Sequence, residues 1–156
     1  MSPLARLAAA IYYRLNISGT VPSDGPGLLV ANHPNSLLDP MLVLAAAHRP
    51  VRLLAKAPLF DDPKVGWLVK AFRSIPVYRR HDDPTQVGRN DEMFRAVHAA
   101  LGAGAAVALF PEGISHSEPS LTPLKTGAAR IALGAAPLIG RDFPIVPVGL
   151  VFREKV

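Results

Sequence analysis

The chain has 156 residues, of which 49% are apolar and 19% charged, which is typical of one globular domain with a buried core. It contains no cysteine, which excludes a disulfide framework, thiolate metal ligands and a cysteine nucleophile. A formal net charge of +5 favours anionic partners, namely lipid headgroups, nucleic acid or a small anionic ligand, without choosing among them.

The N-terminal segment is predicted to form an amphipathic helix over residues 3–15. Its apolar residues recur at helical spacing along one stripe: Leu4, Leu7, Ile11 and Leu15. Arg6 and Arg14 lie to one side of the stripe, where long basic side chains can reach lipid headgroups. We expect residues 1–18 to associate with a membrane surface. The alternative is an ordinary helix packed on the domain.

The rest of the chain, residues 19–156, alternates short apolar runs with helical patterns. Five apolar runs predict strands, at residues 27–31, 51–55, 75–78, 105–110 and 145–152. The segments between them predict helices, at residues 39–47, 64–72, 90–102 and 122–133. Asn90 is the expected N-cap of the third helix, and Thr122-Pro123 is the expected start of the fourth.

This alternation indicates an α/β domain with a mostly parallel central sheet flanked by helices. The chain stops just after its last predicted strand, so we expect the domain to be incomplete at its C-terminus. No stretch has the roughly 20 consecutive apolar residues that a transmembrane helix needs.

The first candidate group of catalytic residues follows the first predicted strand, where active sites of parallel sheets lie. His33 is followed by Asp39 after five intervening residues. Histidine is the natural general base near neutral pH, and a carboxylate at its other ring nitrogen fixes its tautomer. His33 and Asp39 are therefore a candidate pair. The alternative for Asp39 is a helix N-cap before Pro40.

Two further polar groups follow later strands. Arg79 and Arg80 end the third strand, and arginine forks match phosphate oxygens. Glu112 and Gly113 follow the fourth strand, where a glycine turn can direct backbone N–H groups at an anion. Lys125 is expected in the first turn of the next helix. The alternatives are a solvated strand end and an ordinary polar turn.

These groups, in this order, resemble the glycerolipid acyltransferases of the bacterial PlsC type, which include lysophosphatidate and glycerol-3-phosphate acyltransferases. The resemblance runs from about Gly19 to Val151 and includes a fourth block, Ile145-Val146-Pro147-Val148. It implies a glycerol-3-phosphate acyltransferase-like fold in which His33 is the base on the acceptor hydroxyl and Asp39 orients it. Arg79 is implied to bind the acceptor phosphate. The residues implied in substrate binding are Asn32, Arg79, Arg80, Glu112, Gly113, Ser115, His116 and Lys125.

The sequence departs from the family pattern at three places. The common form has four residues between the histidine and the aspartate, and the five found here resemble a subset that includes fungal glycerol-3-phosphate acyltransferases. Ser74 replaces the glycine that usually opens the second block. Ile114 and Ser115 stand where the family often has Thr-Arg, so one phosphate-binding arginine is missing. Arg80, His116 and Lys125 are the candidates to supply its charge.

The resemblance implies transfer of a fatty acyl group from acyl-CoA or acyl carrier protein to a hydroxyl of lysophosphatidate or glycerol-3-phosphate in phospholipid biosynthesis. The thioester is a substrate, and no metal or resident cofactor is implied. The enzyme is expected to be peripheral, at the cytoplasmic face of a membrane. Nucleic acid is not expected as a partner, because the basic residues are scattered and not interleaved with aromatics.

Two other functions remain open. One is a hydrolase in which the same His-Asp pair activates water on an acyl ester or thioester. The other is a basic α/β domain that binds lipid without catalysis. The remaining histidines, His48, His81 and His98, lie at no metal-ligand spacing and are expected to be structural.

Overall fold

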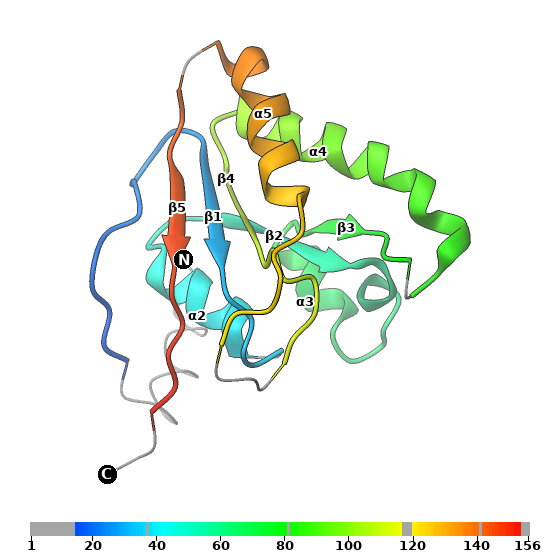
Figure 1. Cartoon of the computed structure of the whole chain (residues 1–156), viewed down its shortest axis with the longest axis horizontal. Coiled ribbons are helices and arrows are strands. Elements are labelled where there is room, and N and C mark those ends of the chain that lie inside the picture. Colours follow the sequence, from blue (N-terminus) through cyan, green and yellow to red (C-terminus); the bar gives the residue numbers. More distant parts are fainter. Residues whose placement is uncertain (1–14, 37, 81, 117–119, 141, 154–156) are drawn as a thin grey trace.

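The computed structural model describes residues 15–36, 38–80, 82–116, 120–140 and 142–153. The predicted N-terminal helix therefore lies almost entirely outside the described residues. The α/β prediction is confirmed: a five-stranded, fully parallel sheet has the strand order β3-β2-β4-β1-β5, with helices packed on it (Figure 1). The strands are β1 (Gly27–Ala31), β2 (Val51–Lys56), β3 (Ile75–Val77), β4 (Ala106–Leu109) and β5 (Ile145–Val148).

Within the described residues, four α-helices and two 3₁₀ helices connect the strands. The α-helices are α2 (Leu38–Ala46), α3 (Gly66–Ala71), α4 (Asn90–Gly102) and α5 (Gly127–Ile139). The 3₁₀ helices, which the sequence did not reveal, are η1 (Ala57–Phe60) and η2 (Pro84–Arg89), each with a proline in its first turn. A proline fits there because the first N–H groups of a helix have no intrahelical partner.

The sheet buries an apolar cluster on each of its two faces. Adjacent residues of a strand point to opposite faces, so Leu28 and Leu29 of β1 belong to different clusters. The cluster beneath α4 and α5 includes Leu28, Val97, Leu101, Val107 and Ile131. The cluster beneath α2 includes Leu29, Val43, Leu44, Val51 and Leu53. Burial on both faces explains why the central strands are continuous apolar runs.

Two predicted helix starts were wrong. Asn90 does not cap α4, because η2 runs directly into this helix and gives Asn90 helical dihedral angles. Its side-chain amide instead accepts from the N–H of Tyr78 at 3.0 Å and donates to the C=O of Tyr78 at 2.6 Å. Asn90 therefore ties the start of α4 to the end of β3.

The helix predicted from Thr122 begins five residues later, at Gly127. The N–H and the hydroxyl of Thr122 both donate to Glu112, and the N–H of Lys125 donates to the C=O of Pro111. These long-range bonds hold the segment as a loop. Lys125 consequently precedes α5 and does not lie in its first turn.

Candidate active site

The loop after β1 brings His33 and Asp39 into contact. His33 Nδ1 lies 2.8 Å from Asp39 Oδ2, with the Asp39 side chain fully buried and the His33 side chain 15% exposed. Since the carboxylate accepts a hydrogen bond from Nδ1–H, the neutral ring presents the lone pair of Nε2 as its basic site. Among the described residues no hydrogen bond to Nε2 is found.

Asn35, which the sequence analysis passed over, frees Asp39 from a capping role. Asn35 Oδ1 accepts from the N–H of Leu38 at 3.2 Å, and the Asn35 N–H donates to Asp39 Oδ2 at 2.6 Å. Asn35 thus caps the first turn of α2, and the bend it makes brings the Asp39 carboxylate back to His33. The sequence does contain a signal for this cap. Asn35 is an asparagine three residues before Leu38, the first residue of α2.

The loop after β4 holds His33 from the other side. Since β1 and β4 are parallel neighbours, the loops that follow them leave the same edge of the sheet. The His33 N–H donates to Glu112 Oε1 at 2.8 Å, and the His33 C=O accepts from the N–H of His116 at 3.2 Å. The Phe110 ring stacks on the imidazole, with centroids 4.0 Å apart and planes 14° apart. The catalytic candidate is therefore fixed through both its backbone and its ring.

Glu112 is the buried link between these loops. Only 2% of it is exposed, and its two oxygens accept from the N–H of His33, from His116 Nε2, and from the N–H and hydroxyl of Thr122. Burial by itself raises the pKa of Glu112, but the hydrogen bonds from His116, Thr122 and His33 outweigh it and lower the pKa to about 2. Its predicted contact with the acceptor stays a prediction, because the structure engages both oxygens within the protein.

Gly113 forms a tight turn against the Lys125 side chain. Its φ is +71°, and its N–H donates to the C=O of Phe110 at 3.0 Å. A Cβ added at Gly113 would lie 2.6 Å from Lys125 Nζ. The left-handed conformation therefore favours glycine, and a side chain there would also displace the end of the Lys125 side chain.

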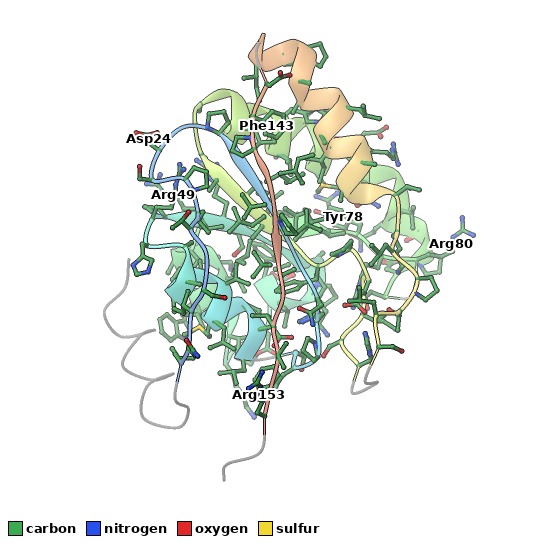
Figure 2. The ribbon with its side chains drawn as sticks, turned by 60° about the vertical axis from the view of Figure 1, so that its left-hand side comes forward. Asp24, Arg49, Tyr78, Arg80, Phe143 and Arg153 are labelled. Carbon is green, nitrogen blue, oxygen red and sulfur yellow. The ribbon has the colours of Figure 1, made fainter. Side chains whose placement is uncertain are left out.

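Arg79 reaches the same turn from the end of β3. Its Nη1 donates to the C=O of Gly113 at 2.9 Å, while Nε and Nη2 form a bidentate ion pair with Asp82 at 2.6 and 2.8 Å. Arg80 is exposed, and its side chain points away from the body of the molecule (Figure 2). Of the two arginines, the structure therefore brings only Arg79 to the Gly113 turn.

The other predicted substrate-binding residues differ in their surroundings. Asn32 exchanges two hydrogen bonds, of 2.9 and 2.6 Å, with the backbone of Leu150 and so ties the end of β1 to the segment after β5. Ser115 is exposed on the loop after β4. His116 is half-buried against Glu112.

Within the described ranges no cluster of three His, Asp or Glu side chains could hold a metal ion.

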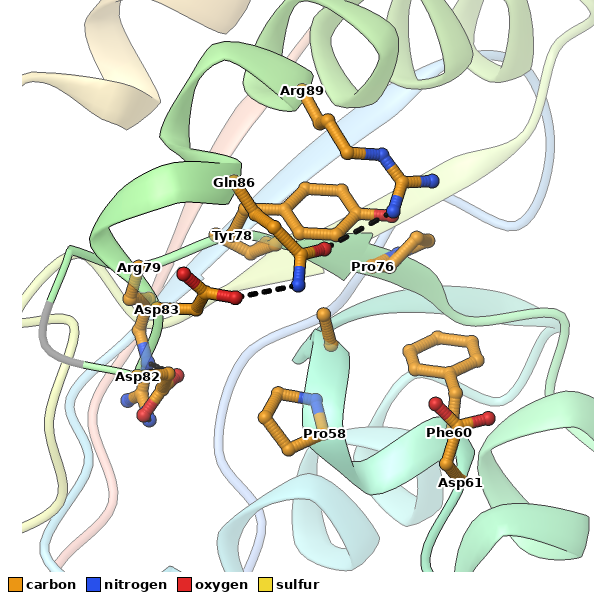
Figure 3. A pocket seen from close by; sticks show the side chains of 12 residues that line it. Pro58, Phe60, Asp61, Pro76, Tyr78, Arg79, Asp82, Asp83, Gln86 and Arg89 are labelled. Carbon is orange, nitrogen blue, oxygen red and sulfur yellow. Dashed lines mark hydrogen bonds and ion pairs between the residues drawn. The ribbon is translucent and has the colours of Figure 1, made fainter.

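A hollow of about 520 Å³ lies beside Arg79, between η1, β3 and η2 (Figure 3). Its charged lining consists of three carboxylates and two guanidinium groups: Asp61, Asp82, Asp83, Arg79 and Arg89. Gln86 Nε2 donates to Asp83 at 2.7 Å, and Gln86 Oε1 accepts from Arg89 at 3.1 Å (Figure 3). This hollow could not be predicted from the sequence, because it is formed by elements that meet only in the folded chain.

Comparison with known proteins gives one family and several relatives. A family model described as "Acyltransferase" matches residues 14–151. Glycerol-3-phosphate O-acyltransferase 2 of Saccharomyces cerevisiae is 45% identical over 70 residues, which cover 42% of this chain and 9% of the relative. Lyso-ornithine lipid O-acyltransferase of Pseudomonas aeruginosa is 28% identical over 151 residues, which cover 97% of this chain and 52% of the relative.

A solved structure shows the same fold. The crystal structure of the 1-acyl-sn-glycerophosphate acyltransferase PlsC from Thermotoga maritima matches with a TM-score of 0.67 and 22% identity, over 85% of this chain and 51% of that chain. This chain spans between 9% and 60% of the length of the curated relatives it matches.

Proposed function

Since the chain belongs to the acyltransferase family, whose model matches it from residue 14 to residue 151, we propose that it transfers a fatty acyl group from acyl-CoA or acyl carrier protein to a hydroxyl of lysophosphatidate or glycerol-3-phosphate. One observation supports the chemistry above all others. The buried Asp39 contacts Nδ1 of His33 at the carboxyl edge of the sheet, which leaves Nε2 as the base.

In the proposed reaction, Nε2 accepts the proton of the acceptor hydroxyl as the hydroxyl oxygen attacks the thioester carbonyl carbon. The tetrahedral oxyanion collapses, the C–S bond breaks, and the thiolate leaves and takes up the proton from the imidazolium. Asp39 stabilises the imidazolium between these steps, and its burial strengthens that attraction. No acyl-enzyme is formed, since His33 acts only on protons.

We place the enzyme at a membrane surface, on its cytoplasmic face. In the part of the chain that the structure describes, no helix is both long and apolar enough to cross a bilayer. Three apolar side chains on the segment between β4 and α5 are exposed: Ile114 by 51%, Leu121 by 64% and Leu124 by 58%. Exposed apolar groups beside a site for lipid substrates favour contact with a lipid surface.

The relatives' names separate two acceptor classes. One relative is named for glycerol-3-phosphate and another for a lyso-ornithine lipid. We propose a phosphate-bearing acceptor, because the chain is basic and because Arg79 and Lys125 both lie at the Gly113 turn beside His33.

A screen of acceptors with palmitoyl-CoA tests the proposal, with thiol release and acylated product both measured. We expect thiol release that requires an acceptor and matches the acylated product mole for mole. The matched control is His33→Ala, with folding checked by circular dichroism. Thiol release that is equal with and without acceptor identifies a hydrolase. A folded protein inactive with every acceptor and donor contradicts the proposal.

A further inference from the structure

We infer that the outer face of α3 is a docking surface for an anionic lipid membrane. This α3 face consists of one aromatic and three basic residues: Trp67, Lys64, Lys70 and Arg73. The inference rests on the membrane placement in the proposed function, and it names a surface that makes the contact.

The aromatic residue of the α3 face is unusually exposed. Trp67 is 68% exposed, although tryptophan is on average a highly buried residue. Its Nε1 donates to the C=O of Lys64 at 3.0 Å, so the one polar group of the indole is already bonded within the protein. The ring can therefore enter the headgroup region of a bilayer without losing a hydrogen bond to water.

The charges of the α3 face are free to meet anions. Lys64, Lys70 and Arg73 are exposed, and within the residues that the structure describes none of them forms an ion pair. The carboxylates closest in sequence do not neutralise them. Asp61 lines the hollow beside η1, and Asp62 accepts from two backbone N–H groups at the start of α3, at 2.8 and 3.2 Å.

The α3 face is built on a rigid base. A Cβ at Gly66 would lie 2.7 Å from the C=O oxygen of Phe60, so α3 packs on η1 with its backbone in close contact. The last turn ends at Arg73, whose φ is +50° and whose N–H donates to the C=O of Lys70 at 2.9 Å. Glycine is the usual residue in this conformation because it strains other residues. Arginine there supplies a third cation to the face despite that strain.

The α3 face lies near the edge of the sheet that carries the catalytic candidate. η1 begins directly after β2 ends, and all strands of the sheet are parallel, so η1 and the loop of His33 leave the same edge. Figure 1 shows α3 at the end of the sheet where the loop after β4 also lies. A membrane docked on α3 is therefore next to the edge at which a lipid acceptor must reach His33.

A second copy of the chain suits the α3 face less well than a membrane. Stable protein interfaces bury about 800 Å² on each partner around an apolar centre, whereas this face offers one large apolar side chain among three cations. Two such faces meeting across a twofold axis would also place cations against cations. An anionic bilayer complements both parts of the face, because its headgroups attract the cations and its interface accepts the indole.

The test uses Trp67 as its own probe, because it is the only tryptophan in the chain. Fluorescence of the full chain is recorded with vesicles of phosphatidylcholine containing about one third phosphatidylglycerol, and with vesicles of phosphatidylcholine alone. With the anionic vesicles we expect a blue shift of the emission and quenching by lipid brominated on its acyl chains, both weakened by salt. Vesicle sedimentation measures how much protein is bound.

Three outcomes of this measurement overturn the inference. Protein that does not sediment with anionic vesicles has no such docking surface. Protein that sediments while the emission of Trp67 is neither shifted nor quenched binds through another surface. A blue shift that grows with protein concentration in the absence of vesicles shows that a second copy covers the face.

Two matched double variants test the charges. Lys64→Gln/Lys70→Gln removes two charges from the α3 face, and Arg95→Gln/Arg130→Gln removes two from exposed positions on α4 and α5. We expect the first to weaken binding to anionic vesicles by about 3- to 30-fold and the second by less than about threefold, since a basic residue at an anionic surface contributes about 1 kcal/mol. Equal losses would show that only net charge matters and would overturn the inference.

Acylation separates this inference from the proposed function. Lysophosphatidate is offered in vesicles and as a soluble short-chain form, and we expect Lys64→Gln/Lys70→Gln to slow only the reaction in vesicles. If lipid quenches Trp67 but no acceptor is acylated, the inference stands and the proposed function is wrong. If lysophosphatidate in vesicles is acylated and Trp67 is never quenched, the proposed function stands and the inference is wrong.

Discussion

At the scale of single residues, Asp39 decides whether His33 works as a base alone or in a pair. Since Asn35 caps α2, Asp39→Asn leaves the cap side chain intact and changes the group that faces Nδ1 of His33 and the N–H of Asn35. An amide can donate to Nδ1 and so favour the wrong tautomer. We expect acyl transfer to fall by about 10²- to 10⁴-fold, the range for loss of a positioned base, with little change in stability.

The measurement for Asp39 is turnover with saturating acceptor, beside the unfolding midpoint in urea. His33→Ala should lose at least as much activity and also remain folded, because the hydrogen bonds of the His33 backbone to Glu112 and His116 do not depend on its side chain. Near-normal turnover in Asp39→Asn would leave His33 acting without an orienting carboxylate.

Glu112 gives a second prediction at this scale, concerning stability and pH. Its pKa is about 2 in the folded protein against an ordinary value of 4.5, so folding favours the anion. A carboxyl group whose pKa is lower in the folded protein than in the unfolded chain stabilises the fold at pH values above the unfolded pKa. This stabilisation is lost as the pH falls from about 4.5 towards about 2. The shift corresponds to roughly 3 kcal/mol at most.

Glu112→Gln should remove this part of the pH dependence. It should also destabilise the protein at pH 7 by about 1–3 kcal/mol, because an amide cannot accept all four hydrogen bonds. Urea unfolding at pH 6 and pH 3.5 measures both effects. A variant that loses as much stability between these pH values as the unmodified protein would show that other carboxylates cause the acid sensitivity.

At the scale of elements, the turn after β4 depends on one glycine. Gly113→Ala places a Cβ at φ +71° and against Lys125, so we expect destabilisation of about 1–2 kcal/mol. Gly127→Ala is the matched control, since Gly127 begins α5 and has open space around its Cα. Alanine there should be neutral or stabilise the helix by a few tenths of a kcal/mol to about 1 kcal/mol. Thermal unfolding distinguishes the two. Equal midpoints would mean that the turn tolerates a side chain.

At the scale of the whole molecule, the prediction is binding to a membrane surface. The apolar stripe of residues 3–15, with Arg6 and Arg14 beside it, predicts attachment to anionic liposomes that weakens as salt is added. Deletion of residues 1–15 should remove most of this binding, and the double variant Arg6→Gln/Arg14→Gln should remove mainly its salt dependence. Liposome sedimentation is the measurement.

A result in which the deletion partitions like the full chain would place the membrane contact elsewhere. The exposed Leu121 and Leu124 beside the site are then the next residues to replace with serine. If the deleted protein instead fails to fold, the N-terminal helix belongs to the domain.

The sequence by itself determined the class of fold, the five strands and the identity of the candidate catalytic pair, His33 and Asp39. These follow from local patterns: apolar runs form strands, helical spacing forms helices, and the Asn32-His33 motif with Asp39 follows the first strand. The errors were two missed 3₁₀ helices, the C-terminal ends of the last helix and strand, and the helix starts at Asn90 and Thr122. At these two starts, side-chain hydrogen bonds to distant segments overrode the local capping signals.

Only the tertiary structure decided which residues the site brings together. His33 and Glu112 are 79 positions apart, and they meet because β1 and β4 are neighbours in the strand order β3-β2-β4-β1-β5. That Arg79 reaches the C=O of Gly113, 34 positions away, depends likewise on where the chain folds back. Local patterns set the conformation of each segment, whereas strand pairing across long sequence separations sets which loops meet at the site.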